Sequence, residues 1–126
     1  MKKLAILLLM LASTSLVCAQ PQIHKNVVER FKTNLNDNDY EQIYQMFSWK
    51  MKKSKPKEFF FNIFNRVKNE YGNLQMLKLN NYVQRSDKFR GVYDGSFDNG
   101  TLTVKITTNG SGEIIGLYIL KDKNFF

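Results

Sequence analysis

Cysteine, histidine and proline are nearly missing from this sequence of 126 residues, which contains one cysteine, one histidine and two prolines. A lone cysteine cannot form a disulfide within the chain, so the fold must rely on ordinary packing. The single histidine, His24, would have to serve any Ser/His/Asp triad or zinc site, and no G-x-S-x-G motif accompanies it. The composition therefore excludes disulfide-rich scaffolds and argues against these two kinds of catalytic centre.

Long apolar runs are also scarce, and the unbroken one lies at the N-terminus. Two lysines precede an apolar run over residues 4–11, and small and polar residues follow it. Val17 and Ala19 then suit the two specificity positions of a cleavage site before Gln20. This three-part layout is typical of a secretory signal. The sequence therefore predicts a signal peptide over 1–19.

Two other interpretations of this N-terminal segment are less favoured. A retained membrane anchor needs roughly 20 apolar residues, and the apolar run breaks at Ser13. A lipoprotein would carry its lipid on Cys18, but the residue before it is the branched Val17 rather than a small one. We therefore expect an exported protein, periplasmic or extracellular, with no transmembrane segment after processing.

The processed chain is predicted to be a single basic domain over 20–126. Removal of Lys2 and Lys3 with the signal lowers the formal net charge from +8 to +6. Outside the inner membrane the anionic partners for such a charge are lipid headgroups, lipopolysaccharide or acidic glycans, and nucleic acid is not expected. A basic surface that only keeps the protein soluble is the favoured interpretation.

The first half of this domain has the apolar period of helices. Ile23, Val27, Val28, Phe31 and Leu35 predict a helix over 23–35, and the polar run 36–39 ends it and caps a second helix that buries Tyr40, Ile43, Tyr44 and Phe47. A lysine-rich connector over 49–57 follows. Ser54 is the expected N-cap of a third helix, with Pro56 in its first turn and Gly72 at its C-terminal cap. We expect this third helix to be the centre of the core.

From residue 73 onward the apolar period approaches two, which is typical of strands. Four strands are predicted, near 74–85, 88–98, 101–108 and 113–120. The Asn-Gly pairs at 99–100 and 109–110 predict hairpins. The apolar face of the first strand changes sides, which indicates a bulge, and the third strand alternates as if one face of the sheet were wet. The fold class is therefore α+β, with N-terminal helices packed on a curved antiparallel four-stranded sheet.

Several apolar and glycine motifs together resemble a known family. They are Phe31-x-x-x-Leu35, Asp39-Tyr40-x-x-Ile43-Tyr44-x-x-Phe47, Phe59-Phe60, Tyr71-Gly72, Tyr93-x-x-x-Phe97, Gly100-x-Leu102-x-Val104-x-Ile106 and residues 112–119. The chain resembles, over roughly 24–120, an accessory domain of unknown function that precedes secreted bacterial serine hydrolases and α/β-hydrolases. The resemblance implies a cone similar to nuclear transport factor 2 or cystatin, and no assigned activity. Because no hydrolase follows in this sequence, we expect the domain to act alone or on a secreted hydrolase in trans.

Catalytic motifs find little support in the sequence. Ser54 and Lys57 match S-x-x-K and residues 71–73 match Y-x-N, but no K-T-G triplet accompanies them. His24 is expected at the surface, because it lies close to the processed N-terminus, where chains fray. Asp94 is the one carboxylate that a small pocket enzyme of this fold class would use inside the cone. No motif predicts a metal or another cofactor.

Two groups of residues are the candidates for binding. Aromatic side chains with polar tips are expected to line the mouth of a pocket between helix and sheet, namely Tyr44, Trp49, Tyr82 and Tyr93. The lysines of the connector are either a solvated loop, which is favoured, or a patch that docks on an anionic surface, namely Lys50, Lys52, Lys53, Lys55 and Lys57.

The sequence thus favours an exported, non-catalytic binding or accessory module whose ligand or protein partner is unknown. The alternative is a small pocket enzyme, similar to an isomerase or a dehydratase, of the same fold class. The oligomeric state is left open.

Overall fold

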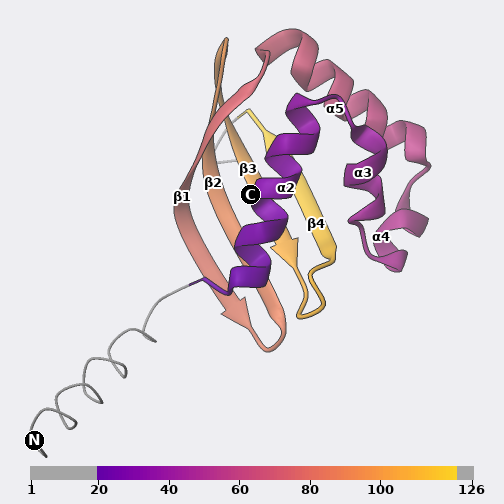
Figure 1. Cartoon of the computed structure of the whole chain (residues 1–126), viewed down its shortest axis with the longest axis vertical. Coiled ribbons are helices and arrows are strands. Elements are labelled where there is room, and N and C mark those ends of the chain that lie inside the picture. The colour runs from indigo at the N-terminus through magenta and orange to yellow at the C-terminus, as the bar shows by residue number, and fades with distance from the viewer. Residues whose placement is uncertain (1–19, 122–126) are drawn as a thin grey trace, which may run out of the picture.

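The computed structural model of the protein describes residues 20–121 (Figure 1). The predicted signal peptide, 1–19, lies outside the described residues. The elements follow the predicted order, helices first and then a four-stranded antiparallel sheet that is open rather than closed into a barrel. The predicted α+β class is therefore confirmed.

Two of the helices match the predicted segments closely. Helix α2 (Gln22–Asn36) buries one stripe of side chains, and the short α3 (Tyr40–Gln45) begins where the Asp39 carboxylate accepts a hydrogen bond from the Gln42 backbone N–H at 3.3 Å. An N-terminal cap of this kind satisfies a backbone donor that the helix itself leaves free. The stripe on α2 begins at His24 rather than Ile23, whose side chain is exposed.

The lysine-rich connector is itself a helix, which the sequence pattern did not predict. Helix α4 (Trp49–Ser54) is capped by Ser48, whose hydroxyl oxygen accepts from the Met51 N–H at 3.3 Å. No side chain of α4 is fully buried, so its sequence carries no apolar period. Ser54 ends α4 and donates its hydroxyl hydrogen to the Met51 carbonyl, so its prediction as the cap of the next helix is wrong.

Helix α5 (Lys57–Tyr71) follows, with Pro56 in the capping position and Gly72 after its last turn. Gly72 has a φ of 78°, in the region that favours glycine, which confirms the predicted C-terminal cap. In Figure 1, α2 lies across the sheet, while α3, α4 and α5 lie to one side beyond β4. The helix that lies across the sheet is therefore α2, and α5 contributes Phe60, Phe64 and Val67 to the core from one side.

The sheet is a meander in the order β1-β2-β3-β4, made of β1 (Leu74–Arg85), β2 (Lys88–Phe97), β3 (Gly100–Thr108) and β4 (Ile114–Leu120). Both predicted hairpins are present. Register shifts near 74–76 and 79–81 interrupt the β1–β2 ladder and confirm the irregular first strand.

The core lies between α2, α5 and the helix-facing side of the sheet. Its fully buried side chains include Phe31, Phe47, Phe64, Leu35, Ile43, Leu74, Val104, Ile106 and Ile114. The other face of the sheet is less exposed to solvent than predicted, because Thr103 and Lys105 on β3 are both buried. Burial and the nearby Arg90 charge lower the pKa of Lys105. A central strand is flanked on both sides by neighbouring side chains, which is why this face is not uniformly wet.

Candidate functional site: a groove beside β4

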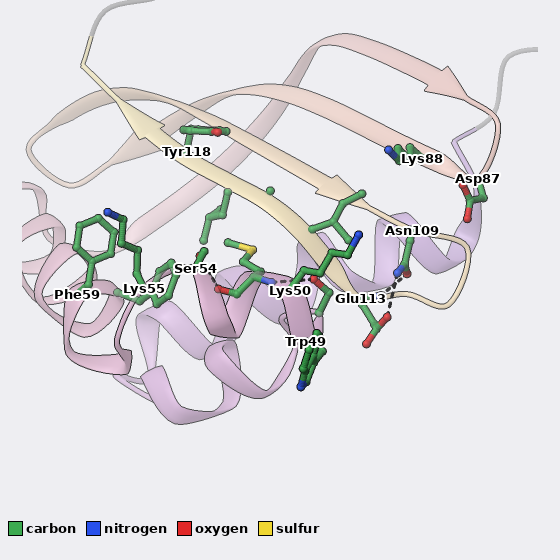
Figure 2. Close-up of a pocket in the computed structure, with 16 residues that line it drawn as sticks. Trp49, Lys50, Ser54, Lys55, Phe59, Asp87, Lys88, Asn109, Glu113 and Tyr118 are labelled. Carbon is green, nitrogen blue, oxygen red and sulfur yellow. Dashed lines mark hydrogen bonds between the residues drawn. The ribbon is translucent and has the colours of Figure 1, made fainter.

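A groove of about 890 Å³ runs between α4, the start of α5 and β4 (Figure 2). Its walls come from segments far apart in sequence, 48–60 on the helical side and 113–118 on the strand side. Figure 2 shows Lys55 and Phe59 at one end, and Asn109, Glu113 and Asp87 at the other. Its volume lies within the range of ligand sites.

Three large aromatic side chains that border the groove are exposed. Trp49 is 66% exposed, Phe59 44% and Tyr118 61%. The Lys53 ammonium lies 4.0 Å from the centre of the Trp49 ring, and that of Lys55 lies 5.4 Å from the Phe59 ring. Exposed aromatic surface with cations over its faces is typical of binding sites for proteins and ligands.

The five lysines of the predicted anionic-surface patch divide into different environments. Lys57 forms an ion pair with Glu41 at 2.8 Å, and Lys52 donates a hydrogen bond to the Gln45 amide oxygen. The bond from Lys57 lowers the pKa of Glu41, and the carboxylate raises the pKa of Lys57 in return. Two of the remaining lysines, Lys50 and Lys55, line the groove, and Lys53 covers Trp49 at its rim.

The aromatic candidates likewise lie in two places. Trp49 lines the groove, and Tyr44 packs on Phe47 and Phe60 behind it. Tyr82 and Tyr93 instead lie beside His24 under the N-terminal turn of α2, where Tyr82 and His24 have ring centres 5.9 Å apart. The structure therefore does not bring these four side chains together around one opening.

His24 is fully buried, so its prediction as a surface residue is wrong. Its Nδ1 lies 2.8 Å from the Thr108 hydroxyl and its Nε2 lies 3.0 Å from the Tyr93 hydroxyl, both hydrogen-bonding distances. Gln20 donates a further hydrogen bond to Tyr93 at 3.1 Å. Because α2 begins at Gln22, His24 belongs to a packed helix rather than a frayed end. His24 precedes Val27, Val28 and Phe31 by three, four and seven residues, and this helical spacing is the sequence signal for its burial.

Asp94 does not face the helices, which corrects its proposed place inside a cone. Its neighbour Tyr93 is buried on the helix side, and successive residues of a strand point to opposite faces. Asp94 pairs with Lys78 and Thr103 across the sheet, and the Asn80 amide donates to its carboxylate at 3.5 Å. The alternation of side chains already forbids Tyr93 and Asp94 from sharing one pocket.

Residues 20–121, the part that the structure describes, contain no clustered metal ligands and no candidate membrane-spanning helix. No three histidine, cysteine, aspartate or glutamate side chains in that range are placed to hold a metal ion. Over the same range, no helix combines the length and the apolar character needed to cross a membrane.

Comparison with known proteins gives a family but no activity. No curated protein matches the chain, and no solved structure matches it either. A family described as a protein of unknown function, DUF3887, matches residues 28–117, which span the stretch from α2 to β4 and take in the whole of α4 and α5. The chain therefore belongs to the DUF3887 family of proteins of unknown function.

Proposed function

We propose that this domain is an exported, non-catalytic binding module that holds an acidic segment of a partner protein in the groove beside β4. The observation that carries the proposal is the exposure of Trp49, Phe59 and Tyr118 around one groove. Aromatic side chains supply much of the binding free energy at protein interfaces. Without a partner, their apolar surface stays in unfavourable contact with water.

The charge of the groove supports an acidic partner. Lys50 and Lys55 line it, Lys53 lies at its rim, and none of the three has a carboxylate ion-pair partner within residues 20–121. The ion pair of Lys57 with Glu41 links the start of α5 to α3, so Lys57 already has an acidic partner within the domain. Complementary charge increases the rate of encounter and sets the orientation of the partner.

A partner in trans also agrees with the resemblance to accessory domains of secreted hydrolases. In this proposal the open sheet and α2 form the cone of a nuclear transport factor 2-like fold, and a secreted hydrolase is the expected partner. Export through the N-terminal signal would bring both proteins to the periplasm or the exterior.

The alternative, a small pocket enzyme, finds less support in the geometry. His24 is enclosed and hydrogen-bonded through both ring nitrogens, so a substrate cannot reach it without opening the packing around α2. The groove carboxylate of Glu113 accepts a hydrogen bond from Asn109 at 2.9 Å in the β3–β4 turn. That contact gives Glu113 a structural role in the turn.

The experiment is a selection from a library of random twelve-residue peptides on immobilised protein beginning at Gln20. We expect enriched peptides with net negative charge and apolar side chains, which bind in solution and lose affinity for the Phe59→Ala and Trp49→Ala variants. Exchange of Lys50 and Lys55 for glutamine should weaken binding at low salt, because exposed charges are screened as salt rises.

The matched control exchanges Lys25 and Arg30, two exposed cations of α2 outside the groove, for glutamine. It changes the net charge equally and should leave affinity within about twofold, since long-range attraction alone is weak at moderate salt. Peptides that are basic, or that bind Phe59→Ala as well as wild type, would refute the proposal. Strong binding to anionic vesicles with no peptide enrichment would instead favour a membrane surface.

A further inference from the structure

The outer edge of β4 borders the groove, and among residues 20–121 it is paired only at its first residue, Ile114. The strand order leaves β1 and β4 at the two edges. Half of the backbone N–H and C=O groups of an antiparallel edge strand point away from its neighbour. Register shifts interrupt β1, the opposite edge, whereas β4 has its one irregularity at its beginning, beside Thr107 and Thr108. From Gly116 to Leu120 the β4 strand is regular.

Among the described residues, 20–121, the edge is paired once by another part of the chain. Phe47 forms an isolated parallel bridge with Ile114, in which the Ser48 N–H donates to the Ile114 carbonyl at 2.9 Å and the Ile114 N–H donates to the Met46 carbonyl at 2.8 Å. The chain then turns away at Ser48 into α4. Within residues 20–121, no other backbone hydrogen bond from outside the sheet reaches β4.

The groove follows this edge rather than one face of the strand. Consecutive residues Ile115, Gly116, Leu117 and Tyr118 all line it, although successive side chains of a strand point to opposite faces. A groove that is lined by side chains from both faces of β4 must run alongside the edge of that strand. The regular stretch from Gly116 to Leu120 is about 16 Å long, and its first three residues border the groove.

The side chains of the groove indicate what kind of strand would lie there. One face of the added strand would meet Tyr118, and the other would meet the helical wall with Met51 and Phe59. Lys55 lies at the end near Phe59, and Glu113 and Asp87 lie at the opposite end (Figure 2). An extended segment with apolar residues in its middle and a carboxylate near Lys55 is complementary to this arrangement.

We infer that the partner segment binds by adding a fifth strand to the outer edge of β4, between that strand and the wall formed by α4 and α5. This inference rests on the proposed function and specifies its mode. Backbone hydrogen bonds then supply affinity that tolerates sequence variation, and the aromatic and lysine side chains select an acidic, apolar segment.

The test is an N-methyl scan of one selected peptide, with binding measured by fluorescence anisotropy. Each methyl group removes one backbone N–H and leaves the side chains unchanged. In a paired strand only alternate N–H groups face β4, so methylation at every second central position should weaken binding about tenfold or more. Methylation at the positions between them should have much less effect.

Hydrogen exchange provides the second measurement, made on the complete processed protein. Bound peptide should slow exchange at alternate amides between Gly116 and Leu120, and the amides of β1 serve as the unaffected edge control. The contrary result is a peptide that needs Phe59 for binding but shows no alternating effect of N-methylation and no alternating protection of β4 amides. That result would overturn the inference of a fifth strand and leave the proposed function standing. A failure to bind in a Phe59-dependent way would overturn both.

Discussion

Phe59 and Phe64 lie on the same helix and differ mainly in burial, so replacing each by alanine separates the stability of the fold from its binding. Phe64 is 1% exposed, and its ring meets those of Phe31 and Tyr40 with centres 6.4 and 5.6 Å apart. Removal of a buried phenylalanine costs about 3–5 kcal/mol, because the transfer energy is lost and a cavity remains. Phe64→Ala should therefore remove a large part of a total stability of about 5–15 kcal/mol.

Phe59→Ala should behave differently although the same atoms are removed. Its side chain is 44% exposed, and its ring centre lies 5.4 Å from that of Phe60 with the two rings nearly perpendicular. Less apolar area returns to water and no enclosed cavity forms, so we expect a cost of at most about 1 kcal/mol. The variant should lose peptide binding while it keeps its fold.

Urea denaturation followed by circular dichroism at 222 nm measures both variants on one scale. With a slope of about 1–3 kcal/mol per molar urea, Phe64→Ala should lower the midpoint by at least about 1 M, and Phe59→Ala by much less. Equal shifts would show that the assignment of the buried face of α5 is wrong. A folded Phe59→Ala that binds peptide normally would remove the aromatic basis of the groove.

The remaining predictions concern the buried histidine, a close packing contact and processing. Burial lowers the pKa of His24 below its ordinary value of 6.5, so the unfolded chain takes up a proton at a higher pH than the folded protein does. The free energy of unfolding should therefore fall as the pH drops from about 7.5 to 5.5. Urea midpoints measure this effect, which should be absent in His24→Gln. A β-carbon at Gly91 would lie 2.6 Å from Cε2 of Tyr93, so Gly91→Ala should lower the free energy of unfolding by about 1–3 kcal/mol. At Gly110 the nearest atom to an added β-carbon is 3.6 Å away, so Gly110→Ala should change it little in the same denaturation assay. Intact-mass spectrometry of exported protein should show an N-terminus at Gln20 without lipid, and a lipid-modified Cys18 would contradict the predicted cleavage.

The strands were predictable because each carries a local signal. Polar and glycine residues mark the turns, and the alternation in β3 fixes which side chains face the helices. The predicted and observed strand bounds agree within about one residue, which is as close as such boundaries can be defined. The turn before β3 is made by Asp98 and Asn99, because Phe97 pairs directly with Gly100.

The groove could not be predicted, because its two walls are brought together by tertiary packing alone. Helix α4 packs only the partly buried Met51 against the core, so its sequence has no apolar period and its lysines resemble an irregular connector. Trp49, Lys50 and Lys55 are candidates from the sequence, whereas no motif points to Phe59 or Tyr118 as binding residues. The burial of His24, in contrast, follows from its spacing to Val27, Val28 and Phe31, because α2 holds the chain packed right up to its N-terminal turn.

The three consecutive phenylalanines at 59–61 explain why the groove has an aromatic wall. Successive residues of a helix are about 100° apart, so three in a row cannot all face one core. Phe60 enters the core at 7% exposure, and Phe61 packs against Tyr40 with ring centres 5.9 Å apart. Phe59 therefore faces the groove. At this exposed position a polar residue would be compatible with the helix. The apolar ring of Phe59 therefore contributes little to folding, and in the proposed complex its burial under the partner segment would contribute to binding.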